Sequence, residues 1–417
     1  MAGEWRERPL AELTDNFDGI RVPVKEADRR AGPYPYYGAS GVVDQVDNYL
    51  FDGEYLLIAE DGENLRTRNT PVAFLARGKF SVNNHAHIVR GNSEADTRFL
   101  MYALSSADIS GYLTGSTMPK LTQGNMNRIP LLTPLLPEQR AIAHILGTLD
   151  DKIELNRRMN ETLEEMARAL FKSWFIDFDP IRAKAEGRDP GLPKPLADLF
   201  PDSFEDSELG EIPKEWKIGR FGDVVEQLRD QENPLSSPDE LFHHFSIPAF
   251  DEGQSPKPEY GESIRSLKSR VLVGVILLSK LNPEIERVWM VDVRPGERAV
   301  CSTEFLVLRA LSPFTRSYVY CLARSPLFRQ QIEGLVTGTS KSHQRAQVDS
   351  ILNLAVVVPP SSIVVAFDHS ADSLLARTLE CRRESRTLAA LRDALLPKLI
   401  SGELRVKDAE RFIGICA

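Results

Sequence analysis

The sequence lacks the features that would assign it to a membrane-bound or disulfide-rich class. Neither residues 1–10 nor any later stretch supplies a long uncharged apolar run, so we expect no signal peptide and no membrane span. The 417 residues include only four cysteines, Cys301, Cys321, Cys381 and Cys416, without C-x-x-C or other metal-type spacing. We expect these cysteines to be reduced thiols of a cytoplasmic protein.

Catalytic motifs are also missing. The sequence has no G-x-x-x-x-G-K-[ST] phosphate loop, no Asn/Asp-Pro-Pro-Tyr/Phe methyltransferase motif, and no Glu-x-Lys suitably placed for a nuclease. On a strand, His85 and His87 would share one face and could hold a metal, but a satisfied surface pair is favoured because no cysteine or acidic partner is evident. The neighbours His243 and His244 would point opposite ways. We therefore expect no catalytic residue, no metal and no cofactor.

Charge is distributed unevenly along the chain. The net charge of −9 argues at first against a nucleic-acid partner. Residues 176–213, however, contain ten acidic and four basic side chains, so the rest of the chain is closer to neutral. Because an acidic connector can coexist with basic faces elsewhere, the net charge does not exclude DNA binding.

One pattern occurs twice. Residues 114–175 comprise a small polar loop that begins at Thr114, a short apolar strand at 129–136, Pro137 and a long amphipathic helix. Residues 337–398 repeat this order, with a polar loop from Thr337, an apolar strand at 351–358, Pro360 and a second long helix. Thr114 and Thr337 precede Pro137 and Pro360 by the same number of residues, which indicates an internal duplication.

Both long helices carry a seven-residue repeat. In the first helix its members are Ile142, Leu149, Asn156, Leu163 and Leu170, with Ile145, Lys152, Met159 and Met166 between them. In the second helix its members are Phe367, Leu374, Cys381, Leu388 and Leu395. Such a repeat forms a narrow seam that another helix covers well. We expect the two seams to cover each other, and a surface helix on a globular core is the alternative.

A variable region precedes each long helix. Similar segments, 5–13 and 216–224, open the two regions. In the first region, Asp52-Gly53 predicts a hairpin turn between strands at 48–51 and 54–60, and strands at 72–77 and 80–89 flank Arg77-Gly78. The expected helices are 97–113 in the first region and 315–335 in the second. The strand candidates of the second region are 244–247, 271–279, 288–293 and 304–309. The six prolines of residues 176–213 exclude a long helix there and predict an extended surface connector.

Several motifs together resemble one family, the specificity subunits of type I restriction-modification systems. They occur in an order and spacing that cover nearly the whole chain, at residues 36–41 (YYGASG), 137–143 (PEQRAIA), 174–180 (WFIDFDP), 209–213 (LGEIP) and 245–251 (FSIPAFD). The second helix departs from the family pattern, because Pro360-Ser361-Ser362-Ile363 stands where a Pro-x-x-Glu-Gln start is usual.

The resemblance implies an α+β fold with two mixed α/β target-recognition domains. A pair of long antiparallel coiled-coil helices would separate these domains and give the chain a pseudo-two-fold internal repeat. The division is then 1–137 and 213–358 for the domains, 138–175 and 359–399 for the helices, 176–212 for the linker and 400–417 for the tail. The implied protein is non-catalytic and binds double-stranded DNA, two methyltransferase subunits and two restriction or translocase subunits. S-adenosylmethionine and ATP would belong to those partners, and no membrane is involved.

Helix length bears on how such a protein would read DNA. A helix over 138–175 would be about 57 Å long at 1.5 Å per residue. Domains at its opposite ends would meet DNA more than one helical turn apart, since a turn is about 34–36 Å. We therefore expect a two-part target whose unread spacer is set by the helices.

Candidate contacts follow from side-chain chemistry. Phosphates and base edges are contacted by Lys, Arg, Asn, Gln and small hydroxyl side chains. The DNA-binding candidates are Asn83, Asn84, His85, Ser116, Thr117, Lys120, Gln123 and Asn125 in the first unit, and Lys268, Lys280, Arg287, Ser340, Lys341, His343, Gln344 and Arg345 in the second. For each residue alone, a solvated loop that satisfies its own backbone is the alternative. Tyr36 and Tyr37 could stack on a splayed base, but burial in a strand is the commoner explanation.

The outward faces of the long helices are expected to dock the partner subunits. The candidate charges are Arg157, Arg158, Glu161, Glu164, Arg168, Arg382, Arg383 and Arg386. A solvated helix face is the alternative for such runs. Two other functional classes remain open: a self-contained DNA-modifying enzyme, which the missing cofactor motifs disfavour, and a coiled-coil adaptor without a nucleic-acid role.

Overall fold

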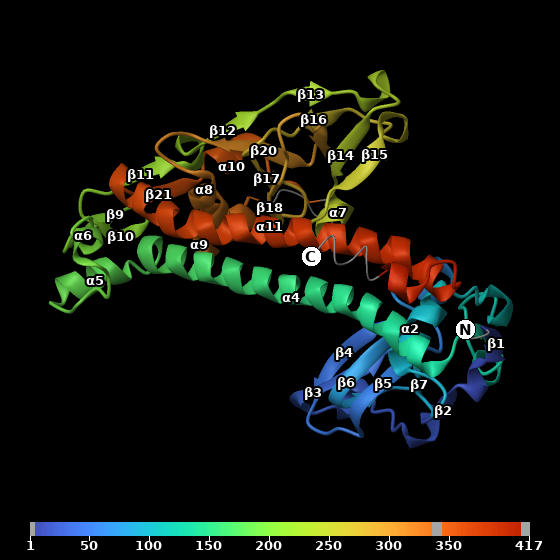
Figure 1. Ribbon diagram of the computed structural model, residues 1–417. Coiled ribbons are helices and arrows are strands. Elements are labelled where there is room, and N and C mark those ends of the chain that lie inside the picture. The colour runs from blue at the N-terminus through green and yellow to red at the C-terminus, as the bar shows by residue number, and fades with distance from the viewer. Residues whose placement is uncertain (1–4, 336–343, 410–417) are drawn as a thin grey trace. The chain divides into compact units, whose positions relative to one another are not determined.

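The chain divides into two compact units in the computed structural model, which describes residues 5–335 and 344–409 (Figure 1). Unit 1 comprises Met1–Glu154 and Thr387–Ala417, and unit 2 comprises Leu155–Arg386. The two longest helices are α4 (Leu136–Phe175) and α11 (Ser361–Ile400), and each contributes one part to each unit. Both units combine helices with sheets, so the expected α+β class is confirmed.

A six-stranded sheet forms the centre of unit 1, with the order β2-β7-β5-β6-β3-β4. All of its pairs are antiparallel except β3 with β6. The strands are β2 (Thr14–Asn16), β3 (Ala31–Gly38), β4 (Gly41–Val46), β5 (Phe51–Ala59), β6 (Ala73–Val82) and β7 (Ala86–Gly91). A separate pair joins β1 (Arg6–Pro9) to β8 (Pro130–Thr133), and the short helices are α1 (Asn64–Thr67), α2 (Thr97–Ser106) and α3 (Gln123–Met126).

In unit 2 the strands form two larger sheets, with the orders β12-β20-β17-β18 and β13-β16-β19-β14-β15. Their bounds are β12 (Val225–Leu228), β13 (Gln231–Glu232), β14 (Leu241–Phe245), β15 (Lys257–Tyr260), β16 (Lys268–Arg270), β17 (Ile276–Ser279), β18 (Val288–Met290), β19 (Ala299–Cys301) and β20 (Phe305–Ala310). A separate pair joins β11 (Lys217–Arg220) to β21 (Ala355–Val358). The helices are α7 (Ile247–Asp251), α8 (Arg316–Ala323), α9 (Pro326–Glu333) and α10 (Val348–Leu352). Each predicted strand segment of the second region overlaps a strand, with shifted bounds.

The pairing of β5 with β6 corrects the hairpin turn predicted at Asp52-Gly53 and the break between strands expected at Arg77-Gly78. Asp52-Gly53 and Arg77-Gly78 do not form hairpin turns, because β5 and β6 run through both positions. Gly53 lies directly opposite Gly78, and both have positive φ, 134° and 73°. Glycine adopts such angles without steric cost, so the strands pass through a local distortion and do not end there. In unit 2 the corresponding strands are broken, into β16 and β17 and into β18 and β19.

Two predicted helices are shorter than expected. The helix expected over 97–113 ends at Ser106, and Asp108 then accepts a hydrogen bond from the Ser110 amide, which competes with helical pairing. The helix expected over 315–335 is two helices, α8 and α9. Pro326 begins α9 after Ser325, whose side chain accepts the amide of Phe328, and proline is well tolerated in a first turn.

Residues 176–213 correct the expectation of an extended connector. As expected they contain no long helix, but they fold into α5 (Asp179–Ala185), α6 (Lys194–Ala197) and a hairpin of β9 (Phe204–Ser207) with β10 (Gly210–Pro213). Phe178, Ile181 and Phe200 are buried in the core of unit 2. The prolines limit helix length, whereas the apolar residues between them fix the segment on unit 2.

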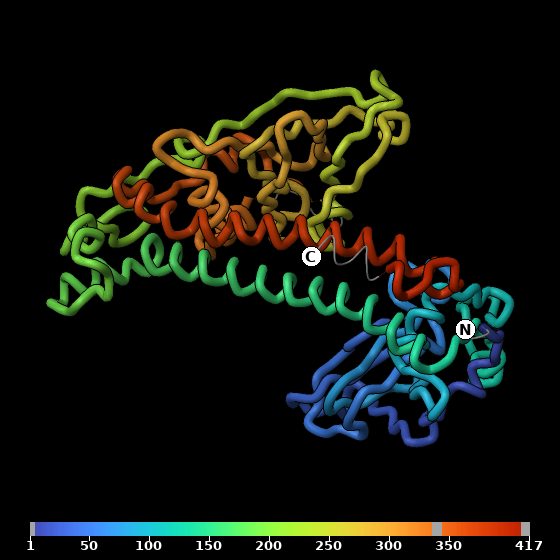
Figure 2. The backbone as a smooth tube through the Cα atoms, viewed as in Figure 1, coloured from blue at the N-terminus to red at the C-terminus, as the bar shows by residue number. Residues whose placement is uncertain are grey.

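Within each unit the two long helices run antiparallel. In unit 1, Asp150 of α4 pairs with Arg392 of α11 at 2.7 Å, and Glu138 pairs with Arg405 at 3.3 Å. In unit 2 the successive partners of Asn156, Met159 and Phe171 are Glu384, Cys381 and Phe367. The backbone tube shows the two helices side by side within this unit (Figure 2). In both units the partner numbers fall as the residue numbers rise along α4, as the resemblance implied; Arg405 lies just after the end of α11.

The buried face of α4 departs from a strict seven-residue repeat. Ile142, Ile145, Leu149 and Asn156 are buried as expected, but Lys152 and Met166 are exposed. Further along, Ala167, Phe171 and Trp174 form the buried face. A straight helix drifts by about 20° per heptad, which explains the change of face.

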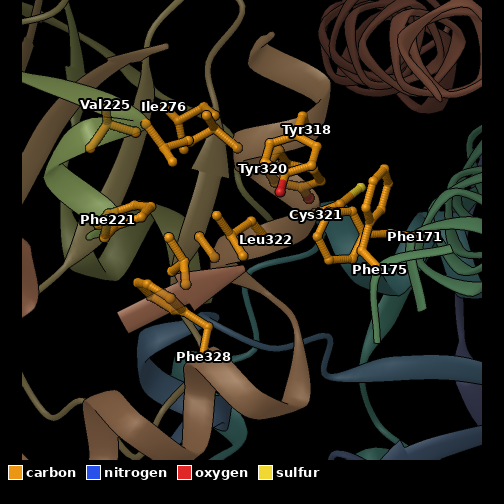
Figure 3. Packing of buried hydrophobic residues seen from close by; sticks show 14 of the residues in the cluster. Phe171, Phe175, Phe221, Val225, Ile276, Tyr318, Tyr320, Cys321, Leu322 and Phe328 are labelled. Atoms are coloured by element: carbon orange, nitrogen blue, oxygen red, sulfur yellow. The ribbon is translucent and has the colours of Figure 1, made fainter. Parts of the chain in front are cut away.

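Aromatic residues dominate the core of unit 2 (Figure 3). Phe171 and Phe175 of α4 contact Tyr318 of α8, with ring centroids 5.4 Å and 5.2 Å apart. Both rings also contact Phe367 of α11. Burial of such side chains contributes about 1.5–3 kcal/mol each, so this cluster fixes both helix segments to the sheet region of unit 2.

Candidate nucleic-acid interface

Three loops of unit 1 meet at one end of its sheet and are held together by backbone hydrogen bonds. The amide of Glu60, after β5, donates to the carbonyl of His85 at 2.8 Å. The amide of Leu121 donates to the carbonyl of Glu60 at 2.7 Å, and the amide of Asn83 donates to the carbonyl of Tyr37 at 2.9 Å. The loop after β5, the loop before β7 and the segment before α3 therefore share one frame with the end of β3.

The same frame recurs in unit 2. The amide of Lys280, after β17, donates to the carbonyl of Glu304 at 3.0 Å. The amide of Ala346 donates to the carbonyl of Lys280 at 3.0 Å, and the amide of Ser302 donates to the carbonyl of Phe245 at 3.0 Å. The frame uses main-chain atoms, so it does not require the same side chains in the two units. It also brings the candidate loops of each unit together.

Charged side chains in unit 1 form a network across this frame. His87, at 2% exposure, places Nδ1 2.6 Å from Asp18 and Nε2 2.8 Å from the carbonyl of Leu121. Arg21 lies 3.2 Å from Glu60, and Lys120 lies 3.3 Å from the same carboxylate. Burial alone would raise the pKa of Asp18, but hydrogen bonds from His87 and a backbone amide, with the Arg21 charge, lower it below its ordinary value.

The histidines correct the expectation of a surface pair. His87 is buried in this network, whereas His85 is half exposed and bonds Asp61 at 2.8 Å. Among the described residues no group of three or more His, Cys, Asp or Glu side chains could hold a metal ion. The sequence pattern missed Asp18 as the partner of His87 and Asp61 as the partner of His85, because each lies far from its imidazole in sequence.

Several predicted residues of unit 1 surround an open cleft. His85 and Asn83 line it together with Asn64, Ser40 and Met118. Residues exposed in the loops of this frame include Asn84, Ser116, Thr117, Lys120 and Gln123. Two candidates serve the protein's own backbone: the Asn83 side chain accepts from the His85 amide, and Asn125 Nδ2 donates to the Tyr112 carbonyl at 2.8 Å. For Asn83 and Asn125, the alternative of a loop residue that satisfies the protein's own backbone therefore has direct support.

The candidates of unit 2 divide in the same way. Lys280 lines a cleft, and Lys268 Nζ donates to Ser266 at 2.9 Å. Gln344 supports the frame through its carbonyl, which accepts from the Asn282 amide, and Arg345 pairs with Glu304 at 2.7 Å. Arg287 corrects the prediction of an available cation, because it is 8% exposed and binds Asp251 through two hydrogen bonds. The candidates Ser340, Lys341 and His343 lie outside the described residues.

The tyrosines of β3 are used internally. Tyr36 is fully buried, and its hydroxyl accepts from the Val24 amide at 2.9 Å. Tyr37 packs against Phe74 and Phe80, and burial raises its pKa. The interpretation as buried strand aromatics is therefore confirmed for Tyr36.

The predicted helix-face charges lie in two environments. Arg157, Arg158, Glu161 and Arg168 are exposed. Glu164 and Arg382, at 13% and 14% exposure, pair with each other, and Arg324 of α8 also pairs with Glu164. Arg383 and Arg386 both pair with Asp292. Burial alone would raise the pKa of Asp292, but these two guanidinium groups lower it below its ordinary value. Glu164 and Arg382 thus point into unit 2, a correction to their expected outward position, because α11 and α4 are covered there by the sheet region.

Among the described residues, the cysteines form no disulfide. Cys301, Cys321 and Cys381 are all buried, and burial raises the pKa of both Cys301 and Cys321 to about 12. Thiols held protonated at neutral pH are poor nucleophiles and poor metal ligands. Within the described part of the chain, no helix is both long enough and apolar enough to cross a membrane.

Comparison with known proteins gives consistent matches. Residues 2–165 match a family model described as the type I restriction modification DNA specificity domain. The chain is 26% identical to the MjaIX specificity subunit of a type I restriction enzyme from Methanocaldococcus jannaschii, over 97% of this chain and 94% of that protein. It is 24% identical to the HindI specificity subunit from Haemophilus influenzae, over 85% and 84% of the two chains.

A solved structure also resembles the fold. The crystal structure of a type I restriction-modification system S subunit from M. genitalium aligns with 95% of this chain and 96% of that chain. The TM-score is 0.62 at 15% sequence identity. The architecture is therefore shared even where few side chains are.

Proposed function

From the premise that this chain belongs to the family of type I restriction-modification specificity subunits, we propose that it selects the DNA target for such a complex. In this proposal it is non-catalytic, and residues 1–137 and 213–358 each read one half of a two-part target. The methyl donor and ATP are used by its partner subunits. Two methyltransferase subunits and two restriction subunits complete the assembly.

The observation that carries the proposal is the repeated backbone frame with unlike side chains. Glu60 and Lys280 occupy the same position in the two hydrogen-bond patterns, as do His85 and Glu304, and Leu121 and Ala346. A frame held by main-chain atoms keeps its loops in place while the exposed side chains differ. This is what a protein needs to read two different half-sites with one scaffold, since base edges are read by side chains.

The exposed and half-buried polar residues around the frame are the proposed DNA contacts. In unit 1 they are Asn84, His85, Ser116, Thr117, Lys120 and Gln123, and in unit 2 they include Lys268, Lys280 and Arg345. Arg345 and Lys120 are each engaged by a carboxylate, Glu304 and Glu60. A phosphate would compete with that carboxylate for the cation, because both present acceptor oxygens.

Methylation mapping tests the proposal. The chain is expressed with its methyltransferase partner in a host that lacks other systems, and the methylated motif is determined. We expect a two-part motif with a fixed gap, and gel retardation by the complex with a duplex that contains the motif but not with a scrambled duplex. No methylation dependent on this chain, together with equal retardation of both duplexes, favours the coiled-coil adaptor. S-adenosylmethionine bound by this chain alone favours a self-contained enzyme.

We also propose that the long helices set the gap. Each of α4 and α11 has 40 residues, and at 1.5 Å per residue each is about 60 Å long. Insertion of seven helix-forming residues into each helix adds about 10.5 Å, or roughly three base pairs at about 3.4 Å each. The gap in the methylated motif should grow by roughly three base pairs while both half-sites stay the same. An unchanged gap contradicts this role.

The exposed charges of α4 are the proposed methyltransferase contacts. Reversal of Arg157 and Arg158 to Glu is expected to weaken co-purification with the methyltransferase and leave the circular dichroism spectrum unchanged. Unchanged co-purification of the double reversal counts against this surface.

A further inference from the structure

A cleft of about 240 Å³ in unit 2 is lined by uncharged donors and cations. It lies among β12, β13, β16 and the start of β20, and its polar side chains are Gln227, Arg229, Gln231, Ser269, Lys280 and Thr303. Among the described residues no carboxylate lines it. Every polar side chain of the lining can therefore donate a hydrogen bond.

Three neighbouring carboxylates are already engaged elsewhere, and Asp230, next to Arg229 in sequence, does not line the cleft. Glu226 pairs with Arg309 at 3.3 Å, Glu232 pairs with Arg298, and Glu304 pairs with Arg345 at 2.7 Å. Within residues 5–335 and 344–409, neither Arg229 nor Lys280 has a recorded ion pair, and Arg229 donates only to the Gln227 side chain, at 3.2 Å. The cleft therefore presents two cations whose charge the described part of unit 2 does not neutralise.

Strand register identifies the equivalent place in unit 1. Asn16 pairs with Val89 in unit 1, and Gln227 pairs with Leu308 in unit 2, at the same level of the sheet. Two residues further along, Asp18 is thus the counterpart of Arg229. The repeated frame already relates Glu60 to Lys280. Two carboxylates in unit 1 therefore correspond to two cations in unit 2.

In unit 1 this place is filled by the chain itself. Arg21 donates to the Ala86 carbonyl at 2.7 Å and to Glu60 at 3.2 Å, and His87 contacts Asp18 at 2.6 Å. Cationic or donor groups of the protein thus neutralise the two carboxylates. In unit 2 the signs of the charges are exchanged. An anion from outside the protein would neutralise Arg229 and Lys280, as Arg21 and His87 neutralise Glu60 and Asp18 in unit 1.

We propose that this cleft of unit 2 binds the phosphodiester backbone of the half-site that unit 2 reads, an assignment that rests on the proposed DNA-recognition function. Phosphate oxygens only accept hydrogen bonds, whereas base edges present donors as well. A lining in which every polar side chain can donate, with two cations that have no ion pair, suits phosphate oxygens. The same side chains could also contact base edges, and a loss of affinity confined to one base pair of the target would show that instead. In this proposal the units differ in how they bind DNA. Unit 2 binds a phosphate at the place where the side chains of unit 1 pair with one another.

The test uses the complex of the full chain with its methyltransferase partners. Arg229→Gln and Lys280→Gln are combined, and Lys194→Gln is the control, because Lys194 is 87% exposed in unit 2 and does not line the cleft. Affinity is measured over a series of salt concentrations for the target duplex and for a scrambled duplex. We expect the double variant to bind both duplexes roughly tenfold more weakly at low salt, with the slope of log K against log salt reduced by about two.

Base preference and fold give the internal checks. The ratio of target to scrambled affinity should not change, and circular dichroism and co-purification should match the wild type. Arg229→Asp with Lys280→Glu introduces the charges of unit 1 and should weaken binding further. Lys194→Gln should leave both affinity and slope unchanged.

Four results would overturn the assignment. One is an unchanged salt slope on both duplexes in the double variant, and another is a loss confined to one base pair of the target. The third is an equal effect of Lys194→Gln. The fourth is binding of millimolar inorganic phosphate that the double variant loses while its affinity for DNA stays that of the wild type, because the cleft would then be a free-anion site. A wild-type complex that does not prefer its target contradicts the proposed function instead. In that case the salt slope on scrambled DNA, compared between the wild type and the double variant, still tests whether the cleft binds phosphate.

Discussion

Unit 1 and unit 2 build the same backbone frame and place opposite charges within it. Asp18 and Glu60 of unit 1 correspond to Arg229 and Lys280 of unit 2, while the main-chain hydrogen bonds around them differ by a few tenths of an ångström in length. Amide and carbonyl groups are common to nearly all residues, so the frame tolerates almost any side chain. The difference teaches that the backbone architecture and the charge at equivalent positions are specified by separate atoms in this protein.

The beginnings of the two long helices differ in a similar way. In unit 1, Gln139 is 1% exposed, its Nε2 donates to the carbonyls of Glu94 and Pro134, and its Oε1 accepts from the Asp96 amide. Ser362 holds the corresponding position at the start of α11, and the helix still begins at Ser361. One helix start is tied to its neighbours by a buried amide, and the other depends on apolar packing of Ile363 and Val364.

The largest expected effect comes from removing the charge of Asp18. Asp18→Asn leaves buried donors without their anion and should destabilise unit 1 by about 3–5 kcal/mol. The matched change in unit 2, Arg229→Gln at an exposed position, should alter stability by no more than about 0.5 kcal/mol. Hydrogen exchange of the Ile88 amide, which donates to Asp18 at 2.8 Å, reports on unit 1 directly. Equal effects of the two variants would remove the contrast between the units.

Acid should weaken the same contrast. The pKa of Asp18 is lowered in the folded protein, so its stabilisation is fully present above the ordinary value of about 3.9 and is lost as pH falls through the folded value. The stability difference between wild type and Asp18→Asn should therefore be large at neutral pH and shrink below about pH 4. Denaturant titrations at several pH values measure this stability difference. A difference that grows in acid would contradict the stabilising role of the Asp18 carboxylate.

A somewhat smaller effect is expected inside unit 2. Glu164→Gln removes the carboxylate shared by Arg324 and Arg382, which are 12% and 14% exposed, and should cost about 2–3 kcal/mol. Glu161→Gln, one turn away on the exposed face at 59%, should cost less than about 0.5 kcal/mol. Chemical denaturation followed by tryptophan fluorescence compares them. A costly Glu161→Gln would mean that the outward face is not simply solvated.

The helix starts give the next comparison. Gln139→Ala leaves two carbonyls and the Asp96 amide without their partner and should destabilise unit 1 by about 1–2 kcal/mol. Ser362→Ala, at an exposed position, should be nearly neutral. Thermal unfolding of both variants in parallel is sufficient, and similar shifts would show that the two helix starts are held alike.

The smallest effect is expected where the strands of unit 1 stay continuous. Gly78 has a φ of 73° with open space around its α-carbon, so Gly78→Ala should cost about 1 kcal/mol through the backbone alone. Glycine at that position lets β6 continue, whereas the corresponding strand of unit 2 is divided into β18 and β19. Hydrogen exchange along β5 and β6 should then rise near Gly53 and Gly78, and unchanged exchange there would argue that glycine is not needed.

The long helices were predictable because their signals are local and repeated. The first was expected over 138–175 and forms over Leu136–Phe175, and the second begins one residue after Pro360. The duplication was visible for the same reason. Lys152 and Met166 were misplaced because a strict seven-residue repeat was assumed, whereas the helix meets different neighbours in the two units.

The residues of the frame were only partly predictable. Lys280, Lys120 and His85 were chosen by side-chain type, which does not reveal a partner. Arg287 was misjudged because its partner Asp251 lies far away in sequence, and Arg229 was overlooked because its counterpart in unit 1 has the opposite charge. Composition identifies candidate donors, but only the fold decides which of them the protein has already used.

The division of the helices between the units has a consequence for inheritance. Because α4 begins in unit 1 and ends in unit 2, while α11 does the reverse, a polypeptide with only one repeat would leave each unit without one helix segment. A second copy of that shortened polypeptide carries the missing segment. We expect such half-length products to pair with themselves and, under the proposed function, to recognise an interrupted palindrome. Genetic recombination that joins halves from different ancestors would then create new specificities without redesign of either half.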